Sequence, residues 1–214
     1  MRTPDGPLSG RRGEAARNDG RILDAAREVF LADPDAPVAA VAHRAGVGIS
    51  ALYRRYRNKE DLLRALARDA LTRYIGDLQA ALADDRDPWT VYREYLARVV
   101  DGGSQALAQR LAGTFTPTPD LGELARQAAD LAEQVHRQAQ QREVLRADVT
   151  SADIVLILEM IMVIDSPGPG GGAALRRRYL DLVLQALRAP GAGPLPAPAA
   201  QPADLAARWR TAGP

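Results

Sequence analysis

Apolar residues recur at helical spacing near the start of the chain. From Arg17 onward, one helical face carries Ile22, Leu23, Ala26, Val29 and Phe30. Asn18 or Asp19 would cap the first turn of this helix. The helix should end near Asp33-Pro34, because a proline restricts the residue before it. A second helix is predicted between Pro37 and Gly46, with a buried stripe of Val38, Val41, Ala42 and Ala45.

A third short helix is predicted over residues 47–57. Its inward positions would be Val47, Leu52 and Tyr56, and its outward positions would be Ser50, Tyr53, Arg54 and Arg57. Two short helices joined at a glycine form a helix-turn-helix, whose second helix is narrow enough to enter the major groove of DNA. Asn58 would cap the next helix, and Lys59 would lie in its first turn, where free backbone N–H groups help to hold a phosphate.

The remainder of the chain also has helical periodicity, and no alternating strand pattern competes with it. Predicted helices continue to Leu82 and then cover residues 89–100, 104–112, 119–147, 151–165 and 173–189. The segment 154–164 is apolar nearly all round, so it must be covered on more than one side. A four-helix interface with a second copy of the chain would cover it through Ile154, Ile157, Ile161, Leu175, Tyr179, Leu182 and Val183. Burial within the core of one chain is the alternative.

These patterns predict an all-α protein of four regions. Residues 1–16 would be a flexible arm, and residues 17–64 a helix-turn-helix domain of three helices. Residues 65–189 would form a larger helical domain for ligand binding and dimerisation. Residues 190–214 are rich in Pro and Ala and would be largely unstructured, apart from a short helical turn over residues 203–210.

Composition narrows the chemistry. The 214 residues contain no cysteine and only two histidines, His43 and His136. A thiolate nucleophile, a cysteine zinc site and an iron–sulfur cluster are therefore excluded, and we expect binding rather than catalysis, without a metal or a cofactor. The N-terminus lacks the apolar core of a secretory signal, and the eleven residues 154–164 are shorter than the roughly 20 that cross a bilayer. A cytoplasmic protein that does not enter the membrane is expected.

Charge is unevenly distributed. The net charge is only +1, yet residues 44–59 contain five basic residues and no acidic one. A purely basic window in a balanced protein indicates a local surface that contacts phosphates. A solvated helix face is the alternative explanation.

The residues of this window and its surroundings resemble a known family. RILDAAREVF (residues 21–30), followed by VAAVAHRAGVGISALYRRYRNKEDLL (residues 38–63), is similar to the DNA-binding domain of TetR-family transcriptional regulators. The resemblance implies a DNA-contacting set of Arg44, Gly48, Ile49, Ser50, Tyr53, Arg54, Arg55 and Lys59. In this set Tyr53 and Lys59 would contact phosphates, and Ile49 and Ser50 would face base edges. Gly48 and Ala51 stand where the family often has Ser or Thr, so direct readout of bases would be thin.

The resemblance also implies a mode of action. It predicts a homodimer that binds a palindromic DNA operator as a repressor and is released by an unknown small molecule bound in the helical body. Candidates for the ligand pocket, chosen on composition, are Trp89, Tyr92, Phe115, His136, Met160 and Met162, although each of these residue types is more often plain core than pocket. Two alternatives remain open. One is a DNA-binding or architectural protein without a ligand. The other is a helical enzyme, although His136, Glu159 and Asp165 have no recognisable catalytic spacing.

Overall fold

Helices form nearly all of the regular structure of the chain. The computed structural model describes residues 7–103, 107, 114–164, 171–190 and 193–209, and it describes no side chain for residues 7–17, 171 and 206–209. Within these ranges there is no strand, only an isolated bridge between Leu145 and Arg188. The predicted all-α class is confirmed. The helices are α1 (Pro7–Ala32), α2 (Val38–Ala45), α3 (Ile49–Arg55), α4 (Lys59–Leu82), α5 (Pro88–Gly102), α7 (Pro119–Gln141), α8 (Ser151–Met162), α9 (Gly171–Leu187) and α10 (Pro202–Trp209).

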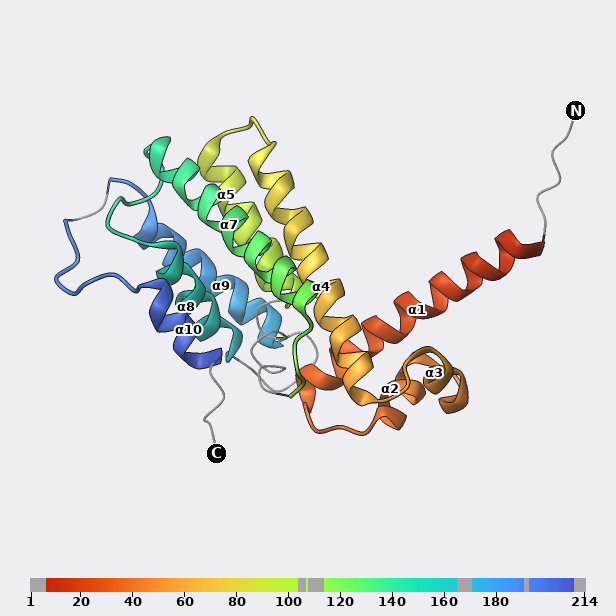
Figure 1. Cartoon of the computed structure of the whole chain (residues 1–214). Coiled ribbons are helices and arrows are strands. Elements are labelled where there is room, and N and C mark those ends of the chain that lie inside the picture. Colours follow the sequence, from red (N-terminus) through yellow and green to blue (C-terminus); the bar gives the residue numbers. More distant parts are fainter. Residues whose placement is uncertain (1–6, 104–106, 108–113, 165–170, 191–192, 210–214) are drawn as a thin grey trace, which may run out of the picture.

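The N-terminal domain consists of α1, α2, α3 and the first half of α4, which lie together at one end of the molecule (Figure 1). Its core is built on large side chains that are fully shielded from solvent, among them Phe30, Val41, Leu52, Leu62 and Leu66. Such burial is the main stabilising term for a small helical domain. The turn between α2 and α3 is made by Gly46, whose φ of 65° lies in the left-handed region that glycine adopts at little cost.

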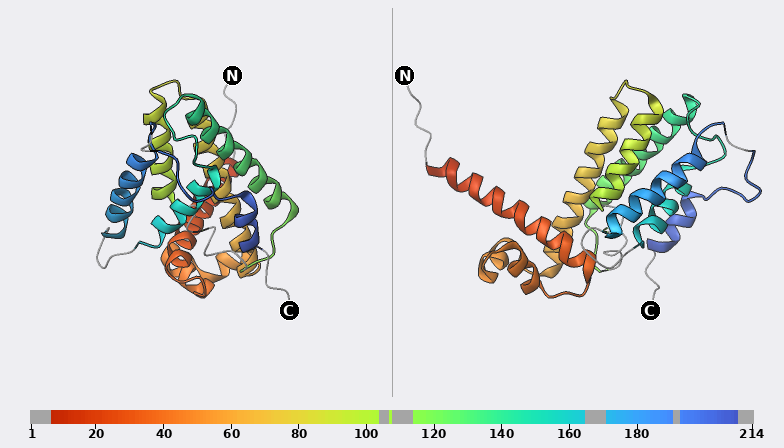
Figure 2. Two further views of the ribbon diagram at one scale, coloured as in Figure 1. Left: turned by 90° about the vertical axis from the view of Figure 1, so that its left-hand side faces the viewer. Right: turned by 180° about the vertical axis from the view of Figure 1, so that it is seen from behind.

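The body of the molecule contains the second half of α4 together with α5, α7, α8 and α9 (Figure 2). A second apolar cluster holds these helices together and includes the buried side chains of Tyr92, Tyr95, Leu96, Leu158 and Leu184. The two clusters share helix α4, so the boundary predicted between residues 64 and 65 falls inside one continuous helix. No helix of the described residues combines the length and the apolar character that crossing a bilayer requires.

The start of the first helix differs from the prediction. In place of a flexible arm up to residue 16, α1 begins at Pro7, and residues 1–6 lie outside the described residues. A proline is tolerated in the first turn of a helix, and none follows until Pro34. This part of α1 projects away from the other helices and therefore needs no apolar stripe to mark it (Figure 1). Consequently Asn18 and Asp19 lie inside α1 and do not cap it.

Two other helices also end earlier than the pattern predicts. Helix α7 stops at Gln141 instead of residue 147, because Glu143 adopts a φ of 56° and the chain then turns to bring Leu145 beside Arg188. Helix α8 stops at Met162 instead of residue 165. The helix expected over residues 104–112 lies outside the described residues except for Leu107.

The C-terminal segment is attached to the body, in contrast to the unstructured tail that its composition suggested. The backbone N–H of Leu195 donates to Asp148 Oδ2, and that of Ala200 donates to Asp153 Oδ1, both at 2.9 Å. Helix α10 follows and covers most of the short helical turn predicted there. This segment is held by bonds from its backbone N–H groups to carboxylates elsewhere in the chain. Amino-acid composition alone does not reveal such bonds.

Candidate nucleic-acid interface

Helix α3 is held from one side and open on the other. Leu52 and Tyr56 are buried in the N-terminal domain and Val47 is half-buried, which confirms the predicted inward set. The opposite face exposes Ile49 and Tyr53, whose side chains are 40% and 47% accessible. Gly48, Ser50, Arg54 and Arg55 are exposed as well. An exposed apolar side chain one turn from an exposed tyrosine on a short basic helix is unusual for a solvated surface, and it suits a helix that docks into a groove.

The path of the chain into α3 is fixed by a cluster around Gly46. The N–H of Gly46 bonds to the carbonyl oxygens of Ala42 and His43, which closes the end of α2. Arg21 of α1 donates from Nη2 to the carbonyl oxygen of Ala45 at 2.7 Å. A Cβ atom on residue 46 would lie 3.0 Å from this guanidinium. The turn therefore requires glycine for its backbone conformation, and a larger residue would also displace the Arg21 guanidinium.

Arg55 is engaged within the protein. Its Nε and Nη2 donate to the two carboxylate oxygens of Asp19 at 2.9 and 2.8 Å, and its guanidinium carbon lies 5.4 Å from the centre of the Tyr56 ring. The Tyr56 hydroxyl donates to Asp19 Oδ1 at 2.5 Å. The hydrogen bond from Arg55 lowers the pKa of the Asp19 carboxyl, and burial together with Asp19 raises the pKa of Tyr56. Asp19 therefore stays ionised, and Arg55 and Tyr56 stay protonated, across the neutral pH range.

Lys59 is also engaged. Its Nζ donates to the carbonyl oxygens of Pro34 and Ala36 at 2.9 and 3.0 Å and lies 5.1 Å from the centre of the Phe30 ring. The predicted cap of α4 is present, since the Asn58 side chain accepts from the N–H of Asp61 at 2.8 Å. Lys59 thus ties the start of α4 to the loop between α1 and α2. Its contact with a phosphate stays a prediction.

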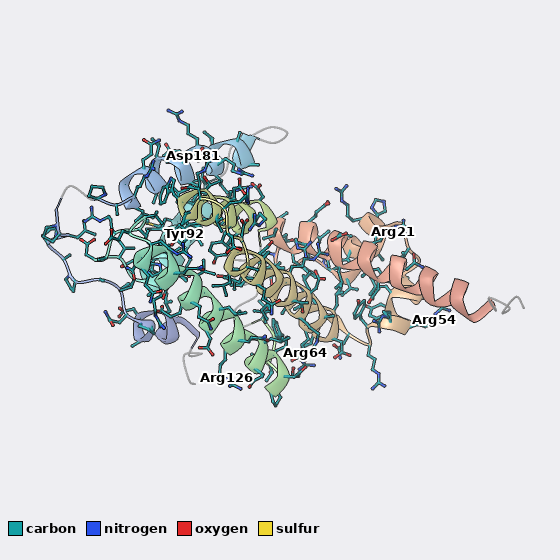
Figure 3. The ribbon with its side chains drawn as sticks, turned by 90° about the horizontal axis from the view of Figure 1, so that it is seen from above. Arg21, Arg54, Arg64, Tyr92, Arg126 and Asp181 are labelled. Carbon is teal, nitrogen blue, oxygen red and sulfur yellow. The ribbon has the colours of Figure 1, made fainter. Side chains whose placement is uncertain are left out.

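The remaining basic groups fall into two kinds. Arg44 donates from Nε to Glu28 at 2.6 Å, and both side chains are largely exposed. Arg54 and Arg57 make no hydrogen bond or ion pair with any residue that the structure describes. Figure 3 shows Arg54 in the N-terminal domain, on the opposite side of the molecule from Tyr92 in the body. Among the basic side chains that the structure describes on α3 and just after it, these two arginines are therefore the ones without a hydrogen-bond or ion-pair partner.

Three of the six pocket candidates come together in the body. Trp89 and Tyr92 stack at 6.4 Å between ring centres, and the Tyr92 hydroxyl lies 3.4 Å from His136 Nδ1. His136 Nε2 lies 2.8 Å from the carbonyl oxygen of Val149. Because a carbonyl oxygen only accepts, we assign the ring proton to Nε2, which leaves Nδ1 to accept from the tyrosine. Burial lowers the pKa of His136 and keeps the imidazole neutral.

The other three candidates lie elsewhere. Phe115 packs against the core of the N-terminal domain and not inside the body. Met160 is 62% exposed on α8, and Met162 packs at the edge of the body core. A selection by composition could not separate these positions, because aromatic and methionine side chains fill cores as well as pockets. A hollow open to solvent does reach Tyr92, and its lining of Asp84, Asp85, Arg86 and Arg142 carries charges that the sequence did not single out.

The predicted interface helices divide between core and surface. Ile154 and Ile161 are buried within the chain itself, because α8 packs against α5, α7 and α9, so these two residues are not available to a second copy. Tyr179 and Leu182 of α9 are 47% and 49% exposed. The half-buried members of the predicted set are Ile157, Leu175 and Val183. Two residues that the prediction missed, Met160 and Val163, add exposed apolar surface on and just after α8.

A link between the N-terminal domain and the body was also missed. Arg64 of α4 donates from Nε to the carbonyl oxygen of Thr116 at 3.1 Å, and the N–H of Thr116 donates to Glu60 Oε1 at 3.1 Å. Phe115 packs beside this link, and Leu107 is fully buried in the N-terminal core. The partners lie more than fifty residues apart in the chain, so no local pattern could have paired them.

Known proteins share both parts of this architecture. Residues 22–66 match the family model described as bacterial regulatory proteins, tetR family. The HTH-type transcriptional repressor LfrR of Mycolicibacterium smegmatis is 41% identical over 76 residues, which are 36% of this chain and 38% of that protein. The match thus spans well under half the length of this curated relative.

Solved structures extend the likeness to most of the chain. A TetR transcriptional regulator from Streptomyces coelicolor is 28% identical with a TM-score of 0.59, over 79% of this chain and 98% of that one. A TetR regulatory protein from Mycobacterium vanbaalenii is 26% identical with a TM-score of 0.56, over 83% and 98% of the two chains. LfrR from Mycobacterium smegmatis, solved in complex with proflavine, has the same fold at 24% identity, with a TM-score of 0.61 over 84% and 99%. Residues 22–66 are therefore similar to the tetR family of bacterial regulatory proteins, and the helical body that follows has the fold of the solved TetR regulators from Streptomyces coelicolor and Mycobacterium vanbaalenii.

Proposed function

We propose that this protein is a sequence-specific DNA-binding regulator of transcription, a repressor that leaves a palindromic operator when a small molecule binds to its body. The observation that carries the proposal is helix α3, whose inner face is locked by Leu52 and Tyr56 while Ile49, Tyr53 and Arg54 stand exposed. A recognition helix needs both properties, because it must be held rigidly and still present side chains to a groove.

The exposed face suggests how DNA would be read. Ile49 is placed to pack against a thymine methyl, and the hydroxyl of Ser50 can bond to a base edge. Tyr53 and Arg54 would contact the phosphate backbone, which sets the register of the helix on the duplex. Gly48 and Ala51 offer no polar side-chain atom, so DNA shape would supply part of the specificity.

The body supports a dimer. Tyr179 and Leu182 of α9 expose apolar surface on the same two-helix unit as Met160 and Val163. Covering such a surface with a second copy would bury it and relate two α3 helices by a twofold axis. Two recognition helices related in this way read a palindrome in successive major grooves.

A small molecule would act through the link between the two parts of the chain. The solved LfrR structure contains proflavine, and the curated relative LfrR is named a repressor. In this chain we place the ligand beside Tyr92 and His136, next to the hollow that reaches Tyr92. A ligand that favours one arrangement of the body shifts the position of α4 through Arg64 and Thr116, and DNA affinity falls by the difference in its affinity for the two states.

Selection of duplexes from a random library at physiological salt tests the DNA-binding part of the proposal. Enrichment of a palindrome is the expected result and supplies an operator for further work. Recovery of only unselected, salt-sensitive binding would favour the alternative of an architectural DNA-binding protein.

The ligand-binding part has a separate test. Proflavine is the first probe to titrate into the complex of protein and labelled operator, with fluorescence anisotropy as the readout. If proflavine releases the duplex from the wild-type protein but not from Tyr92→Ala, the placement of the ligand beside Tyr92 is supported. Retention of the complex at saturating proflavine would argue against an effector of that chemistry for this chain.

A further inference from the structure

Asp19 joins α1 to the end of α3 through three hydrogen bonds. Its Oδ1 accepts from Arg55 Nε at 2.9 Å and from the Tyr56 hydroxyl at 2.5 Å, and its Oδ2 accepts from Arg55 Nη2 at 2.8 Å. The Asp19 side chain is 26% exposed and that of Arg55 is 61% exposed. Two parallel bonds between a guanidinium and a carboxylate fix orientation as well as distance.

The pair changes the charge that α3 offers to DNA. Arg54 and Arg55 are neighbours on the helix, yet Arg55 is bonded to Asp19 whereas Arg54 has no ionic partner among the residues that the structure describes. A guanidinium that already neutralises a carboxylate displaces no counterion from a phosphate, whereas a free one does. The two arginines therefore differ in function despite their adjacent positions.

We propose that Asp19 is a positioning residue for DNA binding: it seats α3 against α1, and it withholds Arg55 from the phosphates so that Arg54 carries the ionic contact at this end of the recognition helix. This inference rests on the proposed function and adds to it a distinction between the two arginines that the family resemblance treats alike. Because Asp19 pairs with Arg55 in the free protein, a phosphate would have to displace a bidentate carboxylate to reach it.

The salt dependence of DNA affinity tests the proposal. The full chain is titrated against a labelled random-sequence duplex and against the selected operator at several salt concentrations. The logarithm of the binding constant falls with the logarithm of salt by about 0.9 for each phosphate contact. Arg54→Ala should reduce this slope by about 0.9, and Arg55→Ala, as the matched variant one residue away, should leave it unchanged.

Asp19→Asn tests the carboxylate partner of the same cluster. It keeps the shape of the side chain and removes the charge, so the released Arg55 should increase the slope on the random duplex by about 0.9. Preference for the operator over the random duplex should fall, because α3 loses its fixed orientation. Adding Arg55→Ala to Asp19→Asn should return the slope to the wild-type value. The separate single variant Asp19→Glu, which keeps the negative charge, should have the wild-type slope. A merely structural role for Asp19 would not produce this pattern of slopes.

Several outcomes would overturn the inference. An equal loss of slope in Arg54→Ala and Arg55→Ala would show that Arg55 contacts a phosphate in the wild-type protein. A slope that stays high in the double variant would assign the effect to loss of the Asp19 anion and not to release of Arg55. The arginine variants leave the Asp19–Tyr56 bond in place, so they remain informative even where Asp19→Asn impairs folding. Failure of the wild-type protein to bind any duplex would instead defeat the proposed function itself, and this inference with it.

Discussion

His136 illustrates how a single buried side chain makes stability depend on pH. Burial lowers its pKa below the ordinary value of 6.5, so the folded protein takes up a proton less readily than the unfolded chain. The stability that the neutral imidazole contributes is complete above about pH 6.5 and is lost as the pH falls towards the lowered pKa. Thermal unfolding should therefore occur at a lower temperature at pH 5.5 than at pH 7.5.

The variant His136→Gln should show a smaller difference in melting temperature between pH 7.5 and pH 5.5 than the wild type. His43→Gln is the matched control, because His43 is exposed on α2 and its replacement should leave the difference unchanged. Equal pH dependence of the melting temperature in the wild type and in His136→Gln would show that His136 is not the source of that dependence.

Two glycines that are two positions apart, Gly46 and Gly48, give a second prediction at the residue scale. Gly46 has a φ of 65°, and a Cβ there would meet Arg21, whereas Gly48 has a φ of −66° and open space around it. Gly46→Ala should cost about 1–2 kcal/mol of unfolding free energy, because an L residue is strained in the left-handed region. Gly48→Ala should be close to neutral in stability. Chemical denaturation of both variants measures the contrast. Equal losses of unfolding free energy would show that the left-handed conformation of residue 46 does not cause the destabilisation.

The residues of the candidate interface were predictable only in part. Apolar spacing identified Leu52 and Tyr56 as inward and Tyr53 and Arg54 as outward, because a helix has a fixed period. The pairing of Arg55 with Asp19 lies outside such reasoning, since the two residues are 36 positions apart and meet only after folding. Sequence therefore suggests which side chains face solvent, and the fold decides which of them are free.

At the scale of elements, packing decides where the predictions hold. Helices with an apolar stripe, such as α4 and α5, were placed close to their observed bounds. The first ten residues of α1 were missed, because this part projects from the molecule and carries no stripe. The end of α7 was also missed, because it depends on Leu145 meeting Arg188, which belongs to a different part of the chain.

The C-terminal segment provides a prediction at this scale. Asp148 and Asp153 each accept a backbone N–H from residues 195–200, and Arg146 together with the Leu195 N–H lowers the pKa of Asp148 to about 2. Hydrogen bonds to charged groups are among the stronger ones, so we expect these two bonds to stabilise the folded chain.

Truncation after Pro190 should therefore lower the melting temperature of the protein by several degrees, and the effect should persist at pH 5, where Asp148 remains ionised. Removal of residues 210–214 alone serves as the control and should leave the melting temperature unchanged. An unchanged melting temperature after the longer truncation would show that the attachment is too weak to matter.

At the scale of the whole molecule, the exposed surface of α9 determines the assembly that we propose. Leu182→Glu places a charge on this surface and should convert a dimer into a particle of about half the mass in light scattering, with operator affinity reduced at least tenfold. Leu195→Glu is the matched control, since Leu195 is similarly exposed but lies in the C-terminal segment. A stable particle of 23.0 kDa in the wild type would exclude the dimer at the concentration used.

The contact of Leu107 with the N-terminal core has a consequence for the boundary between the two parts of the chain. Leu107 is fully shielded among the residues around Phe30 and Leu66, and Phe115 packs against the same cluster. A fragment ending within α4 would lose both side chains from this cluster, at a cost of about 2–5 kcal/mol for the leucine alone. The N-terminal domain thus depends on residues beyond α4 for part of its core, and we expect the chain to melt as one cooperative unit.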